Sequence, residues 1–276
     1  MTQVLLPRAG VPRRSLRDLL DHRSTSATVR RRVLKVACGA VVLGFLVWRL
    51  GTGPFLDGLR ATTPWAVLAA LVVTAGTTWC SAKRWSLVSA KLGRELPMRT
   101  AYAAYYRSQL INSTVPGGVV GDVHRAYRHG WRGVVWERVL GQVVQVAVVG
   151  ALLLPGGWRW VGLGAVLLMA LAGGAVLLLS TLAVAGHLVV FLVAAQSVGV
   201  DLTPLQLVPI GALVLLGAAI PLNVAGWGPR EGVAVWAFTA FGSTAAAGLT
   251  VSVTFGVLAT VATLPGLVVV LGGRRG

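Results

Sequence analysis

Charged residues are scarce in this chain of 276 residues, at 12% of the total, and only eight of them are acidic. Soluble domains carry roughly 25% charged residues. The shortage is uneven, since Asp201 is the only formal charge between Trp160 and Pro229, and residues 232–273 carry none. Uncharged apolar stretches of about 18 residues or more are typical of membrane spans. The composition therefore predicts an all-α, polytopic membrane protein.

Cysteine and catalytic motifs are also nearly missing. The two cysteines, Cys38 and Cys80, both fall in apolar segments and provide neither a disulfide framework nor metal-ligand spacing. No G-x-x-x-x-G-K-[ST] or H-E-x-x-H motif occurs, and no cluster of aspartates suits a metal. No polar stretch is long enough for a soluble catalytic domain. We therefore expect no cofactor, no metal and no enzymatic activity.

What the sequence does have is a basic excess, with a formal net charge of +17. Nine of the 25 basic residues lie at or before the first apolar segment: Arg8, Arg13, Arg14, Arg17, Arg23, Arg30, Arg31, Arg32 and Lys35. In a chain this apolar, such a flank favours anionic lipid at the cytoplasmic surface over nucleic acid, which we do not expect as a partner. Residues 1–32 are predicted to be a disordered, basic cytoplasmic arm.

Apolar segments follow in series from Val33 and form one transmembrane domain, residues 33–273. The predicted segments are Val33–Leu50, Trp65–Ala82, Val139–Leu154, Val161–Leu179, Thr181–Val198, Leu205–Leu222, the short Val233–Phe241 and Ala247–Leu271. With a mixed segment, Ala101–Trp136, they predict about seven to eight transmembrane helices. The division at Ser180 rests on length alone. The run Ala172-Gly173-Gly174 is interpreted as close helix packing.

Orientation follows from the positions of lysine and arginine. The basic residues after the second segment are expected on the cytoplasmic side: Lys83, Arg84, Lys91, Arg94 and Arg99. Both termini are predicted to be cytoplasmic, in a multi-pass protein of the plasma membrane.

Two segments are interrupted. The first is YYRSQLINSTVPGGVVGDVHRAYRHGW, from Tyr105, which breaks at Pro116-Gly117-Gly118 and resumes near Asp122. The second is IPLNVAGWGPREGVAVWAF, from Ile220, which breaks across Asn223–Gly228. Within a membrane, a broken helix requires protein or a water-filled cavity to satisfy its backbone. Paired breaks in two halves of a chain indicate a transport site. We predict two interrupted or re-entrant hairpins, opening to opposite sides as in an inverted repeat.

Charges accompany both breaks. Asp122 and Arg125 are three residues apart, so they share a helix face and can pair. Pro229 and Glu231 suit the first turn of a helix. Arg230 places positive charge at a positive helix end, which is favourable when an anion binds there, and lipid phosphate is the obvious anion.

Each of these features also has a purely structural interpretation. Asp122 and Arg125 can be an ion pair that only holds a hairpin together. Arg230 and Glu231 can lie at an interface, and Asn112 and Asn223 can cap broken helix ends. His187, alone in an apolar segment, is expected to be packed or hydrogen-bonded.

Both segments resemble a known family. Asn112…Pro116-Gly117-Gly118…Gly121-Asp122…Arg125 resembles the N…P-G-G…G-D…R signature of the lysylphosphatidylglycerol synthase transmembrane (flippase-like) family. Pro221…Gly226-Trp227-Gly228-Pro229-Arg230-Glu231 resembles its P…G-x-G-x-R-E signature, and Glu137-Arg138 its E-R element. The chain departs from the family's pattern at Pro229 and Asn223, where apolar and serine residues are more usual. The resemblance covers residues 33–271 and implies a domain that moves lipids or lipid-linked groups between leaflets, here without a synthase domain.

The main hypothesis is therefore a lipid flippase acting on a phospholipid or a lipid-linked anionic headgroup. Candidate lipid-binding residues are Asn112, Pro116, Gly118, Asp122, Arg125, Asn223, Gly226, Gly228, Arg230 and Glu231. Arg125 and Arg230 are expected to contact phosphate, with Asp122 and Glu231 orienting them. Two alternatives remain open: an integral-membrane enzyme acting on a lipid phosphate, and a non-transporting partner of a separate lipid-modifying enzyme.

Overall fold

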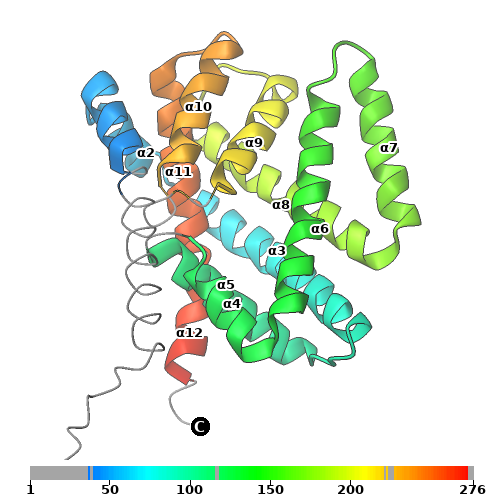
Figure 1. The fold of residues 1–276 in the computed structure, drawn as a ribbon. Coiled ribbons are helices and arrows are strands. Elements are labelled where there is room, and N and C mark those ends of the chain that lie inside the picture. The colour runs from blue at the N-terminus through cyan, green and yellow to red at the C-terminus, as the bar shows by residue number, and fades with distance from the viewer. Residues whose placement is uncertain (1–36, 38–39, 116–117, 221, 223–226, 273–276) are drawn as a thin grey trace, which may run out of the picture. The chain divides into compact units, whose positions relative to one another are not determined.

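The computed structural model describes residues 37, 40–115, 118–220, 222 and 227–272, and the regular elements among them are helices (Figure 1). The predicted all-α class is confirmed. A first helix, Ala40–Leu50, carries no label. The labelled helices are α2 (Gly53–Arg60), α3 (Pro64–Lys91), α4 (Met98–Thr114), α5 (Val120–His129), α6 (Trp131–Leu152), α7 (Trp158–Ala172), α8 (Gly174–Val198), α9 (Pro204–Ala218), α10 (Pro229–Ala240), α11 (Ala245–Val261) and α12 (Pro265–Gly272). The predicted arm, 1–32, lies outside the described residues.

Four stretches of helix are long and apolar enough to cross a membrane: α3, α6, α8 and the stretch Ala245–Leu271, which α11 and α12 share. The first helix and α2 form a pair bent by 99° and would make a fifth span. α7 and α9 are apolar but shorter. By length and composition the described residues therefore support four to five spans, and the predicted seven to eight are not reached.

The outer surface is typical of a protein that faces lipid. Large apolar side chains are exposed along the helices, among them Val72 and Leu168. Exposed tryptophans stand at or next to the first residue of three helices, Trp65 in α3, Trp131 in α6 and Trp158 in α7. Tryptophan at helix ends is common at membrane–water interfaces. The structure thus agrees with a membrane protein.

The helix α3 is longer than its apolar part. It runs for 28 residues, so the helix continues past the predicted end at Ala82 and includes Lys83, Arg84 and Lys91. Arg84 is buried. The prediction was wrong because hydropathy marks where the apolar run ends, whereas the helix continues wherever other helices cover its polar residues.

The division of the long apolar region also differs from the prediction. The chain breaks at Gly173-Gly174, where Gly174 has φ +70°, and Ser180 lies buried inside α8. A positive φ favours glycine because it has no Cβ. The two glycines therefore mark a helix boundary, and Ser180 is part of the interior.

Helices flank both predicted interruptions and fold back as hairpins. α4 contacts α5 across the first break, and α9 contacts α10 across the second. In Figure 1 the first hairpin lies toward the lower end of the view and the second toward the upper end. Residues 116–117, 221 and 223–226 lie outside the described residues. The inverted repeat stays a prediction.

The main hydrophobic core lies beside the second hairpin. It joins α3, α8, α9, α10 and α11 around Phe191, Ile210, Phe238 and Leu258, all fully buried. The rings of Phe191 and Phe255 meet edge to face, 5.8 Å apart. This core fixes α10, which carries the charged residues of the second interruption, against α11.

Candidate functional site: a polar cavity between two charged clusters

The first charged cluster consists of five residues that the fold brings together from α3, α5 and α6: Arg84, Asp122, Arg125, Glu137 and Arg138. Three arginines face two carboxylates, so the cluster carries a net charge of +1. Charges in the interior are tolerated when they are paired and hydrogen-bonded. The contacts of this cluster meet that requirement for both carboxylates.

Asp122 joins four partners from three helices. Its Oδ1 accepts hydrogen bonds from Ser108 Oγ and Arg125 Nη2, both at 3.0 Å. Its Oδ2 accepts one from Asn112 Nδ2 at 2.8 Å and pairs with Arg138. The predicted pairing of Asp122 with Arg125 is confirmed. The aspartate ties α5 to both α4 and α6.

Asn112 also completes the broken backbone. Its Oδ1 accepts a hydrogen bond from Gly121 N at 2.7 Å, in the first turn of α5. First-turn N–H groups have no partner within their own helix. The capping interpretation of Asn112 is therefore confirmed, and the same amide also donates to Asp122.

Gly121 explains why α5 can approach α4 so closely. A Cβ at this position would overlap the backbone of Ser108. Any larger residue would push α5 away and lengthen the bond from Ser108 to Asp122. The glycine that precedes the aspartate is thus a steric condition for the cluster.

Glu137 is fully buried, and both of its carboxylate oxygens accept hydrogen bonds. Arg84 pairs with its Oε1, which also accepts a hydrogen bond from Tyr105 Oη at 3.0 Å. Arg125 Nη2 donates to its Oε2 at 3.1 Å. Arg84 Nη1 also donates to Ser180 Oγ at 3.0 Å, which brings α8 into the network. This carboxylate connects helices that are far apart in sequence.

Arg125 lies in an aromatic enclosure. Its guanidinium carbon is 4.5 Å from the ring centroid of Trp85 and 4.2 Å from that of Tyr105. Such stacking is favourable for a planar cation. Arg125 is 1% exposed, and no described residue accepts a hydrogen bond from its Nε or Nη1.

The second charged cluster consists of Arg230 and Glu231 at the start of α10. Pro229 occupies the first helical position, and Glu231 Oε2 accepts a hydrogen bond from Gly228 N at 2.6 Å, as the predicted helix start requires. Arg230 Nε donates to Glu231 Oε1 at 2.8 Å. The guanidinium lies 5.1 Å from the ring of Trp227 and 5.6 Å from that of Phe255. Both charged residues are buried, so they do not form an exposed interfacial pair.

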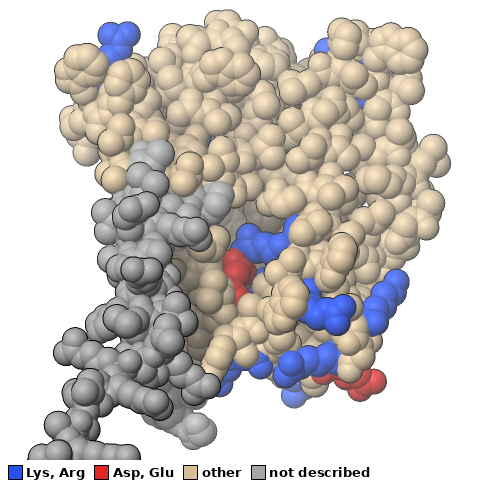
Figure 2. Space-filling view, viewed as in Figure 1, with Lys and Arg blue, Asp and Glu red and all other residues tan. Residues whose placement is uncertain are grey.

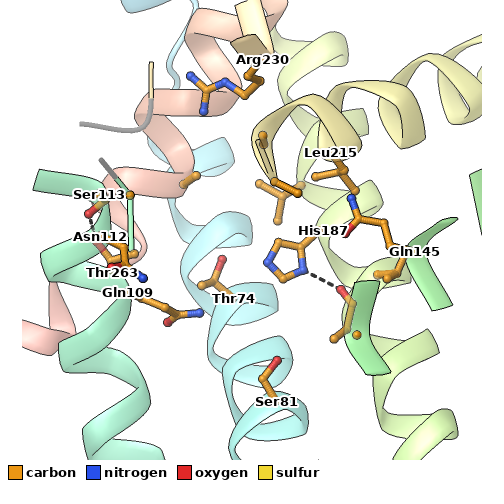
Figure 3. Close-up of a pocket in the computed structure, with 18 of the residues that line it drawn as sticks. Thr74, Ser81, Gln109, Asn112, Ser113, Gln145, His187, Leu215, Arg230 and Thr263 are labelled. Carbon is orange, nitrogen blue, oxygen red and sulfur yellow. Dashed lines mark hydrogen bonds between the residues drawn. The ribbon is translucent and has the colours of Figure 1, made fainter. Parts of the chain in front are cut away.

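A cavity of about 390 Å³ joins the two clusters. Arg84, Glu137 and Arg138 of the first cluster line it, and so does Arg230 of the second. Figure 2 shows basic and acidic atoms within a hollow of this face, below a part of the surface that is mostly uncharged. In Figure 3, Arg230 lies at the top of the pocket and Ser81 at the bottom, with Thr74, Gln109 and His187 between them.

The cavity runs along helix faces. On α3 its lining extends from Thr74 through Ser81 to Arg84, a separation of ten residues or roughly 15 Å along the axis. On α8 it follows Ser180, Ala183, Val184 and His187, a spacing of three and four residues that marks one side of a helix. The cavity is therefore elongated, with polar and apolar side chains along its length.

The predicted site residues divide into three groups. Asn112, Gly118 and Arg230 line the cavity. Asp122, Arg125, Gly228 and Glu231 are buried beside it and are absent from its lining. The remaining three predicted residues, Pro116, Asn223 and Gly226, lie outside the described residues.

Several residues at the cavity had no signal in the sequence. Arg84, Gln142 and Gln145 line it but lie outside both interrupted segments. Gln109 also lines it and lies within the first segment, where no feature of the sequence selects it. Arg138 could have been found, since the E-R element contains it. His187 is hydrogen-bonded as predicted, with its Nδ1 2.6 Å from the carbonyl oxygen of Ala183.

The comparison with protein families gives one match. The family described as lysylphosphatidylglycerol synthase TM region matches residues 32–184, more than half of the chain. This range contains the first interrupted motif and the E-R element but ends before the second motif. No curated protein and no solved structure matches the chain.

Proposed function

The chain belongs to the lysylphosphatidylglycerol synthase transmembrane family, and we propose from this premise that it moves a phospholipid or a lipid-linked anionic headgroup between membrane leaflets. The family places it among membrane proteins related to lipid modification or transport. The transport role is our own inference. We propose that the membrane domain carries it out without any enzymatic reaction.

The cavity between the two clusters carries the proposal. A charged headgroup cannot cross hydrocarbon without losing its hydration, which is costly unless other polar groups replace the water. The cavity offers cations at both ends, Arg84 and Arg138 on one side and Arg230 on the other. A phosphate can exchange between these cations while its acyl chains remain in the surrounding lipid.

Arg138 and Arg230 are the arginines best suited to receive phosphate. Arg138 is 43% exposed, and Asp122 is its one ionic partner in the part of the chain that the structure describes. Arg230 has only its neighbour Glu231 as an ionic partner among the described residues. Arg125, by contrast, is enclosed by aromatic rings and is absent from the cavity lining. We therefore assign Arg125 to the support of Glu137 and Asp122 and revise its expected contact with phosphate.

The two hairpins suggest how access alternates. Gly118 beside the first break and Trp227 beside the second both line the cavity. Movement of either hairpin would open the cavity at a different end, as expected for alternating access. Because the sequence has no nucleotide-binding motif, we propose that a gradient or simple equilibration drives exchange in the plasma membrane, with both termini cytoplasmic.

The proposal is tested by leaflet exchange of fluorescent phosphatidylglycerol in proteoliposomes, measured by quenching from outside with dithionite. We expect exchange above that of empty vesicles. Arg230→Gln and Arg138→Gln should each lower the initial rate by at least roughly tenfold, which corresponds to a loss of ~1.4 kcal/mol of phosphate interaction.

Arg60→Gln is the matched control, because Arg60 is exposed and, among the residues that the structure describes, forms an ion pair only with exposed Asp57. It should exchange lipid at the wild-type rate. Wild-type exchange no faster than empty vesicles for any lipid, or equal rates for wild type and Arg230→Gln, would contradict the proposal.

A further inference from the structure

The stretch of cavity between the arginines is polar but uncharged. Its hydrogen-bonding side chains come from α3, α4, α6 and α8: Thr74, Ser81, Gln109, Gln142, Gln145 and His187. Figure 3 shows Thr74, Gln109, Gln145 and His187 around the same space. Amide, hydroxyl and neutral imidazole groups both donate and accept hydrogen bonds. They are suited to hydroxyl groups, which also do both.

Several of these groups have capacity to spare. His187 Nδ1 lies 2.6 Å from the carbonyl oxygen of Ala183, and a carbonyl only accepts, so Nδ1 carries the proton and Nε2 remains an acceptor. Gln109 Oε1 accepts from Thr78 Oγ1 at 3.0 Å, which leaves its amide donors. The side chains of Gln142 and Gln145 have no hydrogen-bond partner among the described residues.

A cationic headgroup finds no comparable partner. Among the described residues that line the cavity, Glu137 is the only carboxylate. It is 0% exposed, and both of its oxygens are occupied by Arg84, Tyr105 and Arg125. An ammonium group would therefore meet arginines without an available anion.

The net charge of the two clusters also favours an anionic headgroup over a cationic one. Four arginines, 84, 125, 138 and 230, face three carboxylates, 122, 137 and 231, which leaves one positive charge. One phosphodiester, with a charge of −1, neutralises this excess. A further positive charge on the headgroup would be uncompensated in a region of low dielectric, where charge interactions are strong.

We infer that the cavity takes a headgroup with one phosphodiester and an uncharged, hydroxyl-bearing group, and that it rejects aminoacyl headgroups with a net positive charge. This inference rests on the proposed function because it assumes that the lipid headgroup enters this cavity, but it concerns binding and not transport. Arg138 or Arg230 holds the phosphate, while the glutamines and His187 hydrogen-bond the hydroxyl groups.

Binding is measured first, and it does not depend on transport. The purified full chain is equilibrated in vesicles with equal amounts of phosphatidylglycerol, phosphatidylmethanol and lysyl-phosphatidylglycerol, extracted gently, and its bound lipid quantified by mass spectrometry. Phosphatidylmethanol has the same charge as phosphatidylglycerol but no hydroxyl group. We expect phosphatidylglycerol to exceed lysyl-phosphatidylglycerol at least roughly tenfold and phosphatidylmethanol roughly threefold, about the effect of one hydrogen bond.

The variant Gln145→Glu adds the carboxylate that the cavity lacks. It should reduce the preference for phosphatidylglycerol over lysyl-phosphatidylglycerol at least roughly tenfold. Gln196→Glu makes the same change on the exposed side of α8, outside the cavity, and should leave the preference unchanged.

The exchange assay separates the two proposals. Selective binding without exchange of any lipid would contradict the proposed function and support the inference about the headgroup. Exchange with equal or greater binding of lysyl-phosphatidylglycerol would support the function and overturn the inference. Equal binding of phosphatidylmethanol and phosphatidylglycerol would overturn the role given to the hydroxyl groups.

Discussion

The two charged clusters use the same chemistry, arginine with a carboxylate, in opposite ways. In the first cluster, Glu137 and Asp122 connect α3, α4, α5 and α6 through ion pairs and hydrogen bonds. In the second, Arg230 pairs with the next residue of its own helix, and within the described ranges the one side-chain hydrogen bond from another helix is that of Ser252 Oγ in α11, 3.3 Å from Glu231 Oε1. One cluster joins helices, whereas the other is local.

This difference in connectivity indicates different roles for the two clusters. Breaking the first cluster separates helices, so its charges belong to the framework of the cavity. Turning Arg230 away from Glu231 breaks no ion pair between helices among the described residues and gives up only its stacking on Phe255 in α11. Gly256 leaves room at the guanidinium, because a Cβ there would overlap it. Arg230 can therefore change partners during transport at low structural cost.

The largest loss of stability is expected for Glu137→Gln. The substitution leaves Arg84 and Arg125 buried without their shared carboxylate, and breaking such a buried pair costs about 3–5 kcal/mol. The measurement is the temperature at which half of the protein leaves the monodisperse peak on size-exclusion chromatography after heating in detergent. Glu95→Gln, at an exposed residue without an ion pair among the described residues, should melt like the wild type. An unchanged midpoint for Glu137→Gln would remove the distinction between the clusters.

A smaller loss of stability is expected for Glu231→Gln. Only Arg230 loses its ionic partner, and the glutamine Oε1 can still accept the hydrogen bond from Gly228 N. Arg230 also borders the cavity, where water can hydrate it. We expect a destabilisation of about 1–3 kcal/mol, measured by the same heating experiment. A midpoint as low as that of Glu137→Gln would show that the second cluster also holds helices together.

What could be predicted from the sequence was local. Asp122 and Arg125 are one helical turn apart, so their pairing follows from spacing. Pro229 and Glu231 occupy the first turn of α10, where rules for helix starts apply directly. The two interruptions were visible for the same reason, since proline and glycine act on the backbone close to themselves.

What could not be predicted depends on contacts between distant residues. Arg84 and Glu137 are 53 residues apart, and nothing near Arg84 distinguishes it from a loop cation. The predicted division at Ser180 rests on the length of the apolar run alone, but this serine is buried as a hydrogen-bond acceptor for Arg84. Gln142 and Gln145 form part of the site only because α6 turns this face toward α3 and α8. The polar lining of the cavity is a property of the packed helices.

The smallest effect compares two serines, one in each cluster. Ser108 Oγ donates to Asp122 at 3.0 Å, whereas Ser252 Oγ lies 3.3 Å from Glu231 Oε1. Because hydrogen bonds weaken with length, Ser108→Ala should cost about 1 kcal/mol and Ser252→Ala less. The heating experiment gives both midpoints, and a double-mutant cycle with Glu231→Gln isolates the bond of Ser252. The matching cycle for the first cluster combines Ser108→Ala with Asp122→Asn. A larger coupling energy between Ser252 and Glu231 than between Ser108 and Asp122 would contradict the expected order. It would also show that the second cluster is bound firmly to α11.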